Sequence, residues 1–214
     1  MKNIIIFDIN VDFVKEAGRL SKYGIKIIKS DVENLIDTTQ IDTIVSPANS
    51  FGFMNGGIDK VYMGLFKGIQ MTVQNRIVGF TNTINLGKAY LPIGSAITVP
   101  TGNPKCPNLI CAPTMHLPGN IRNTNNIFLC FTALIYLSKM NPSSIIACPG
   151  LGTGVGALTP KYAVDQIEMA ILQYDTFVYS HAYQNSIKYM DKMNLIVSIW
   201  TWWYQFELDG INLN

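Results

Sequence analysis

Short apolar runs alternate with amphipathic segments along residues 1–173, and this alternation limits the possible folds more than any other feature of the chain. The run "NIIIFDI" is followed by apolar residues at helical spacing and then by a second run, "GIKIIKSDV". Two strands separated by a helix of about three turns suggest a parallel βαβ unit, whose crossover places the helix on a face of the sheet. The pattern therefore predicts a three-layer α/β/α domain.

The same alternation predicts four further strands, in "DTIVS", "GSAITVPT", "NLICAPT" and "SIIACP". We expect one continuous helix in "IDKVYMGLFKGIQMTVQ". The segment "NTNNIFLCFTALIYLSKM" is apolar around most of its circumference, which is typical of a helix buried against a sheet. A last helix is expected in "TPKYAVDQIEMAILQ", with Thr159 as its N-cap and Pro160 at the first helical position.

Residues 174–214 are rich in aromatic side chains, and periodicity does not decide whether "IWTWWYQFEL" is a strand or a helix. We expect this segment to be a C-terminal extension that packs on the main domain, so that residues 1–214 form a single domain. The alternative is an aromatic wall against the base of a ligand.

Charged residues make up only 14% of the chain and the net charge is +2. Such a chain has no broad electrostatic field with which to hold a polyanion, so a nucleic-acid partner is not indicated. A small anionic ligand remains compatible with this composition.

The four cysteines form no CxxC pair, and together with only two histidines they do not make a zinc constellation. We expect buried thiols in a reducing compartment, the cytoplasm, and no metal. The N-terminal apolar run is interrupted by Asp8 and is too short for a signal peptide or a membrane span, so we expect no membrane association.

Three polar segments follow strands: "KSDVEN", "SPANSFGFMNGGID" and "CPGLGTGVGALTP". Ligands of open α/β sheets bind outside the carboxyl ends of the strands, so these segments would converge on one edge if their strands are parallel. Asp31, in the first segment, is either the N-cap of a short helix or an acceptor for an exocyclic amine, and the sequence leaves both roles open.

The last of these segments has glycine at positions 150, 152, 154 and 156 and then enters a helix. Its backbone N–H groups and the helix N-terminus are suited to cradling phosphate, although it has no lysine and is not a P-loop. Residues 152–157, "GTGVGA", also fit the dinucleotide fingerprint. An NAD-binding oxidoreductase is therefore a weaker alternative, because that fingerprint normally opens the first βα turn of its fold.

Taken together, these segments resemble a macro domain, an ADP-ribose-binding module with an α/β/α fold and a mixed, mostly parallel central sheet. Its signature is an Asp after an early strand, an "NAAN" strand end, a glycine run soon after that Asn, and a loop of the form "STGVFGYP". The corresponding residues stand here as "SDV", "SPANS", "MNGGID" and "GLGTGVGA". The blocks "SPANSFGFMNGGID", "APTMHLPGN" and "PGLGTGVG" further resemble a microbial and viral branch of stand-alone macro domains.

The resemblance implies a role for each matching position. Asp31 would bind the adenine amine, Val32 is a further expected ligand-binding residue, and Asn49 would bind the distal ribose. Asp59 lies ten residues after Asn49, the offset at which hydrolytic MacroD-like members carry an Asp. Asn49 and Asp59 are therefore the expected catalytic pair. The residues expected to enclose the diphosphate and distal ribose are Gly56, Gly57, Ile58, Gly150, Gly152, Thr153, Gly154, Val155 and Gly156.

The chain also departs from the family pattern, at Ser46, Pro47, Asn55 and Lys60, and at Gly156 in place of the usual Phe. Lys60 offers a second role for Asp59, which could pair with it or cap the helix that begins near Ile58. We interpret His116 as a hydrogen-bonded loop residue rather than an acid or base.

The resemblance predicts a monomer whose ligand is ADP-ribose, either free or attached to a protein or small molecule, and which needs no cofactor. It further suggests hydrolysis of an ADP-ribose linkage. A non-catalytic ADP-ribose reader is the alternative.

Overall fold

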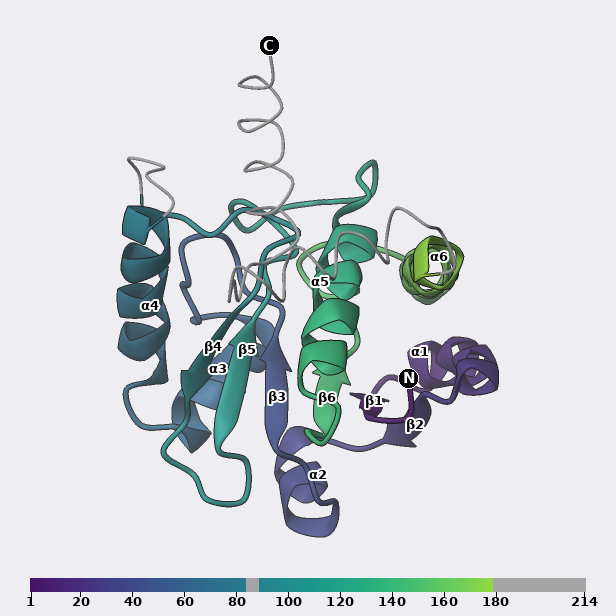
Figure 1. Ribbon diagram of the computed structural model, residues 1–214, viewed down its shortest axis with the longest axis horizontal. Helices are drawn as coiled ribbons and strands as arrows, with labels where there is room; N and C mark the ends of the chain where they lie inside the picture. The colour runs from purple at the N-terminus through teal and green to yellow at the C-terminus, as the bar shows by residue number, and fades with distance from the viewer. Residues whose placement is uncertain (84–88, 179–214) are drawn as a thin grey trace.

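The computed structural model of the protein describes residues 1–83 and 89–178 (Figure 1). The sequence-based interpretation of the aromatic segment after residue 178 lies outside the described residues. Within them, the expected alternation of strands and helices forms three layers, with one sheet between two groups of helices.

The central sheet has six strands in the order β2-β1-β6-β3-β5-β4. All neighbouring pairs are parallel except β4 with β5, which confirms the mixed, mostly parallel sheet. The strands are β1 Ile4–Asp8, β2 Lys26–Lys29, β3 Thr43–Ser46, β4 Ile97–Pro100, β5 Asn108–Cys111 and β6 Ile146–Pro149.

Polar side chains cap the starts of the first and the last helix. The Asn10 side chain accepts hydrogen bonds from the N–H groups of Asp12 and Phe13, and Thr159 Oγ1 accepts one from the N–H of Tyr162 at 3.3 Å. The helices are α1 Val11–Ala17, α2 Val32–Thr38, α3 Gly57–Leu65, α4 Ile69–Thr83, α5 Asn126–Met140 and α6 Pro160–Val178, with a 3-10 helix η1 over Gly18–Tyr23.

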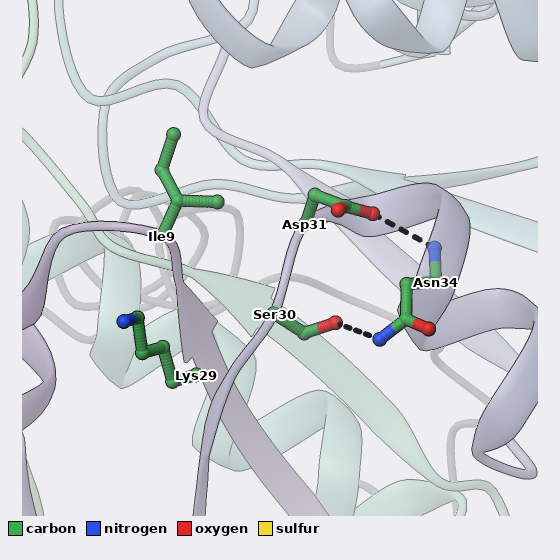
Figure 2. A pocket seen from close by; sticks show the side chains of 5 residues that line it. All are labelled: Ile9, Lys29, Ser30, Asp31 and Asn34. Atoms are coloured by element: carbon green, nitrogen blue, oxygen red, sulfur yellow. Dashed lines mark hydrogen bonds between the residues drawn. The ribbon is translucent and has the colours of Figure 1, made fainter.

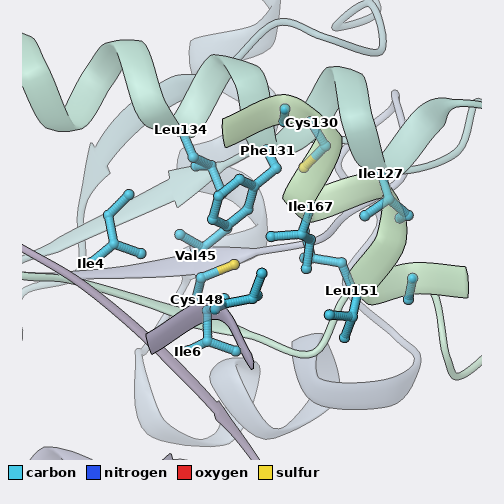
Figure 3. Close-up of a cluster of buried hydrophobic side chains, with 14 of the residues drawn as sticks. Ile4, Ile6, Val45, Ile127, Cys130, Phe131, Leu134, Cys148, Leu151 and Ile167 are labelled. Atoms are coloured by element: carbon cyan, nitrogen blue, oxygen red, sulfur yellow. The ribbon is translucent and has the colours of Figure 1, made fainter. Parts of the chain in front are cut away.

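Each face of the sheet has its own apolar core because successive residues of a strand point to opposite faces. In β1, Ile4 and Ile6 pack with α1, α5 and α6, whereas Ile5 and Phe7 pack with α2, α3 and α4. Figure 3 shows the first core, in which Phe131 and Leu134 of α5 lie over the sheet. All four cysteines are buried and free, as expected.

The expected single helix over residues 58–74 is wrong. The structure has two helices, α3 and α4, separated by a turn in which Phe66 is extended and Gly68 has a φ of +75°. The first expected helix is also shorter than predicted and continues as η1. At the C-terminal end, α6 runs past the predicted boundary at residue 174, and Tyr174 is buried against the core.

Candidate functional site

The three polar segments meet at one edge of the sheet because β2, β3 and β6 run parallel within it. Along that edge the strand order places the β2 loop first, the β6 loop next and the β3 loop last. Three strand spacings separate the outer two, about 14 Å. The edge therefore presents an elongated row of loops, which suits an extended ligand.

At the end of β2 lies a hollow of about 430 Å³, lined by Ile9, Lys29, Ser30, Asp31 and Asn34 (Figure 2). Asp31 Oδ1 accepts a hydrogen bond from the N–H of Asn34 at 2.8 Å, so this side chain caps α2. Its second oxygen has no hydrogen bond within the described residues, and Asp31 is exposed. Val32 is buried in the core, which leaves only its backbone for a ligand.

The loop after β6 presents a run of free backbone donors. Over the described part of the chain, the N–H groups of residues 151–156 have no acceptor. The groups on either side are engaged: Gly150 donates to the carbonyl of Phe7, Ala157 to that of Gly154 and Leu158 to that of Gly152. Clustered N–H groups that point away from the protein's own acceptors are the chemistry that binds phosphate oxygens.

The glycines of this loop serve two purposes. A Cβ at Gly150 would lie 2.0 Å from Asp8 Oδ2, and one at Gly156 would lie 2.6 Å from the Gly152 carbonyl oxygen. Gly152 is crowded by Ile127 and has a φ of +74°. These three positions need glycine for the packing of the loop itself, whereas Gly154 meets no atom within 4 Å and leaves the loop surface open.

The loop after β3 is shaped by Asn49, which is 6% exposed. Its Oδ1 accepts hydrogen bonds from the N–H groups of Phe51 and Phe53, and its Nδ2 donates to the Phe53 carbonyl at 2.8 Å. An amide nitrogen carries two N–H bonds, and the second has no acceptor among the described residues. Asn49 thus folds the loop and retains one donor.

Farther along the same loop, Gly56 and Gly57 face open space, and Gly57 has a φ of +54°. They lead into α3, where the N–H groups of Gly57, Ile58 and Asp59 have no acceptor within the described chain. Free N–H groups at a helix start are the usual consequence of helix geometry, and they favour negative charge nearby.

Asp59 lies in this first turn, yet it is only 7% exposed. Its Oδ1 accepts a hydrogen bond from Ser46 Oγ at 2.6 Å. Burial raises the pKa of the Asp59 carboxyl to about 6, and the hydrogen bond from Ser46 opposes that rise. No ion pair joins Asp59 to Lys60 in the described structure. The N-cap of α3 is Gly56, and Asp59 lies in the first turn, where its charge faces the positive end of the helix dipole.

An aromatic cluster beside Asn49 was not predicted from the sequence. The ring of His116 lies 5.1 Å from that of Phe51 and 5.5 Å from that of Tyr90, both edge-on. His116 is therefore a loop residue, but ring contacts hold its side chain where we expected a hydrogen bond. Any two of Phe51, Tyr90 and His116 are 25 or more positions apart in the sequence. No local pattern could therefore have predicted that their rings meet.

Two further properties of the described residues bear on the type of site. They contain no group of three or more His, Cys, Asp and Glu side chains that could hold a metal ion. None of their helices is long and apolar enough to cross a bilayer.

Known proteins are similar to this chain in sequence. A family model described as Macro domain matches residues 45–167. An uncharacterized protein of Aquifex aeolicus (strain VF5) is 31% identical over 139 residues, which is 65% of this chain and 75% of that protein. An uncharacterized protein of Aeropyrum pernix is 29% identical over 136 residues, 63% of this chain and 66% of that protein.

Solved structures share its fold. The Oceanobacillus iheyensis macrodomain with ADP superposes with a TM-score of 0.52 at 19% identity, over 74% of this chain and 88% of that one. Thermosipho africanus DarTG in complex with ADP-ribose gives a TM-score of 0.53 at 14% identity, over 73% of this chain and 47% of that one. At these identities the likeness establishes the architecture.

Proposed function

This chain belongs to the macro domain family, and from that premise we propose that it binds ADP-ribose and hydrolyses an ADP-ribose linkage. The binding part of the proposal is supported by the two solved structures of the same fold that contain ADP or ADP-ribose. The linkage would join ADP-ribose to a protein carboxylate or to a small metabolite.

The run of free N–H groups at residues 151–156 is the observation that carries the proposal. A diphosphate offers several anionic oxygens, each of which accepts hydrogen bonds from backbone amides. The net charge of +2 supplies no strong general attraction, so affinity has to come from such directed hydrogen bonds.

The order of the loops along the sheet edge suggests in which direction ADP-ribose would lie. The hollow with Asp31 lies at the β2 end, the N–H groups at β6 and the loop with Asn49 and Asp59 at β3. Adenosine, diphosphate and distal ribose follow one another in the same order in ADP-ribose. Adenine would meet Asp31, and the distal ribose would meet the remaining Asn49 donor and the open Gly56–Gly57 backbone.

Hydrolysis would take place at the anomeric carbon of the distal ribose. The bond from that carbon to the linking oxygen breaks, its electron pair leaves with the carboxylate, and positive charge develops on the ribose. Water adds to the carbon, Asp59 accepts the proton of this water, and the proton then passes to solvent. With a pKa of about 6, Asp59 is mostly ionised at neutral pH and can act as this base.

Burial of the Asp59 carboxylate supports a functional role because it has a stability cost. A buried carboxyl with a raised pKa destabilises the folded state at neutral pH, and such groups are concentrated at functional sites. A residue needed only to begin α3 would not have to be buried, because acidic residues serve helix starts equally well from an exposed position.

A non-catalytic ADP-ribose reader is the second candidate, and the hydrogen bonds within the β3 loop favour it. Three of the hydrogen bonds available to the Asn49 side chain are used to fold residues 51–53. If the same bonds persist with ligand, Asn49 orients the ribose through one donor only.

Binding and turnover are tested separately with the full chain. Calorimetry with ADP-ribose tests binding, and tighter binding of NAD than of ADP-ribose would favour the oxidoreductase alternative. Release of ADP-ribose from a carboxyl-linked ADP-ribosylated protein tests turnover. We expect Asp59→Ala to retain binding and to lower release about 100-fold or more, the range of a general base.

Asp37→Ala is the matched control, because Asp37 is an exposed carboxylate of α2 that pairs with Lys105. It should leave binding and release unchanged. Binding without release by the wild type would identify a reader, and release that is equal in wild type and Asp59→Ala would remove Asp59 from the mechanism.

A further inference from the structure

We infer that Ser46 is a positioning residue for Asp59: its hydroxyl holds one carboxylate oxygen and keeps the other, Oδ2, available for water. This inference rests on the proposed hydrolysis, since positioning matters only if Asp59 acts on a water. Ser46 stands where the family pattern has an Asn, so the arrangement belongs to this chain's own sequence.

The two side chains come from different elements and meet in the interior. Ser46 is the last residue of β3 and is fully buried, and Asp59 is the third residue of α3. The distance of 2.6 Å between Ser46 Oγ and Asp59 Oδ1 is typical of a hydroxyl that donates to an ionised carboxylate. Both partners lie on ordered elements, which holds the carboxylate in one orientation.

The second carboxylate oxygen of Asp59, Oδ2, has no hydrogen-bond partner among the described residues and could therefore accept a hydrogen bond from a water. Within the described residues Oδ2 has no hydrogen bond, and it is not among the buried side-chain atoms that lack a partner. Asp59 as a whole residue is 7% exposed. Ser46 thus occupies Oδ1, and we assign Oδ2 to the water.

Among the side chains around Asp59, that of Ser46 favours the ionised carboxylate. Tyr62 of α3 and Cys111 of β5 lie close enough for Asp59 to raise their pKa values, but both groups are neutral near pH 7. The Tyr62 hydroxyl donates to the Val45 carbonyl at 3.0 Å. Over the described chain no Lys, Arg or His forms an ion pair with Asp59, so the hydroxyl of Ser46 is the side-chain contact that favours its ionised form, beside the start of α3.

The test is Ser46→Ala in the full chain, read out in two ways. The first is the pH profile of ADP-ribose release. Loss of the hydrogen bond should move the acidic limb of that profile up by about 1 to 2 pH units. Release at pH 7 should consequently fall about 2- to 10-fold and recover as the pH is raised.

The second readout is the NMR titration of the Asp59 carboxyl carbon, which does not require turnover. Its midpoint should move up in Ser46→Ala by the same amount as the acidic limb. Ser138→Ala is the matched control: Ser138 is equally buried, its hydroxyl bonds to the Ile135 carbonyl within α5, and it should change neither the limb nor the midpoint.

The two readouts separate the possible failures. An unchanged midpoint and limb in Ser46→Ala would overturn the inference while leaving the hydrolase proposal standing. A loss of release by the same factor at every pH, as expected of a purely structural serine, would also overturn it. A wild type without release would end the hydrolase proposal and with it the positioning role of Ser46, even if the midpoint moves.

Discussion

At the scale of single residues, burial of the Asp59 carboxyl makes the stability of the fold depend on pH. The pKa of the Asp59 carboxyl is near 3.8 in the unfolded chain, and burial raises this pKa to about 6 in the folded protein. Between these two values the folded state binds more protons than the unfolded state, so a rise in pH through this window lowers the free energy of unfolding. Above pH 6 the ionised carboxyl costs about 3 kcal/mol.

Asp59→Asn removes this charge and keeps an oxygen that can accept from Ser46. We therefore expect the variant to be more stable than the wild type by up to about 3 kcal/mol at pH 7.5 and equal to it below pH 4. Urea unfolding at a series of pH values measures the difference. The exposed carboxylate in Asp37→Asn provides the control, and a stability gain that does not vary with pH would contradict the assignment.

At the scale of elements, the turn between α3 and α4 is the clearest disagreement with the helix expected from sequence. Gly68 adopts a left-handed conformation there, with a φ of +75° and open space where a side chain would be. An L-residue at such a φ has a backbone cost of about 1–2 kcal/mol. Gly64 is four residues earlier, inside α3, and also faces open space.

The two glycines should therefore respond in opposite ways to alanine. Gly68→Ala should lower the free energy of unfolding by about 1–2 kcal/mol. Gly64→Ala should raise it by about 0.5–1 kcal/mol, because alanine favours helix over glycine. Denaturant unfolding of both variants measures this, and a more stable Gly68→Ala would mean that the two helices can join.

At the scale of the whole molecule, the sheet couples the two apolar cores. The strands β1, β3, β5 and β6 contribute residues to both, so one face cannot unfold without exposing the other. The sequence also predicts that the segment after residue 178 packs on this domain. All three tryptophans, Trp200, Trp202 and Trp203, lie in that segment.

Tryptophan fluorescence therefore reports on the C-terminal segment, while far-ultraviolet circular dichroism is dominated by the domain. If the segment packs on the domain as expected, the two signals should follow one transition with the same midpoint in urea. Phenylalanine replacement of all three tryptophans provides the blank for the fluorescence signal. A fluorescence change that precedes the loss of ellipticity would show that the segment is a separate unit.

The parts of the structure predicted from sequence are those that neighbouring residues decide. The alternation of Ile4, Ile5, Ile6 and Phe7 between the two cores follows from the period of a strand. The cap at Thr159 depends on a side chain and the backbone three residues away, as does the N-cap role that the sequence left open for Asp31. Even the convergence of three loops followed from one assumption, that their strands are parallel.

The sequence by itself thus determined the layers, the cap at Thr159 and, given parallel strands, which loops would meet. Only the tertiary structure decided which contacts the loop residues make there. It showed that Gly150 makes room for Asp8, which no spacing along the chain could indicate. It also brought Ser46 to Asp59, since that contact depends on where α3 settles against the end of β3. Periodicity and capping involve adjacent residues, whereas such contacts arise only when separate elements pack.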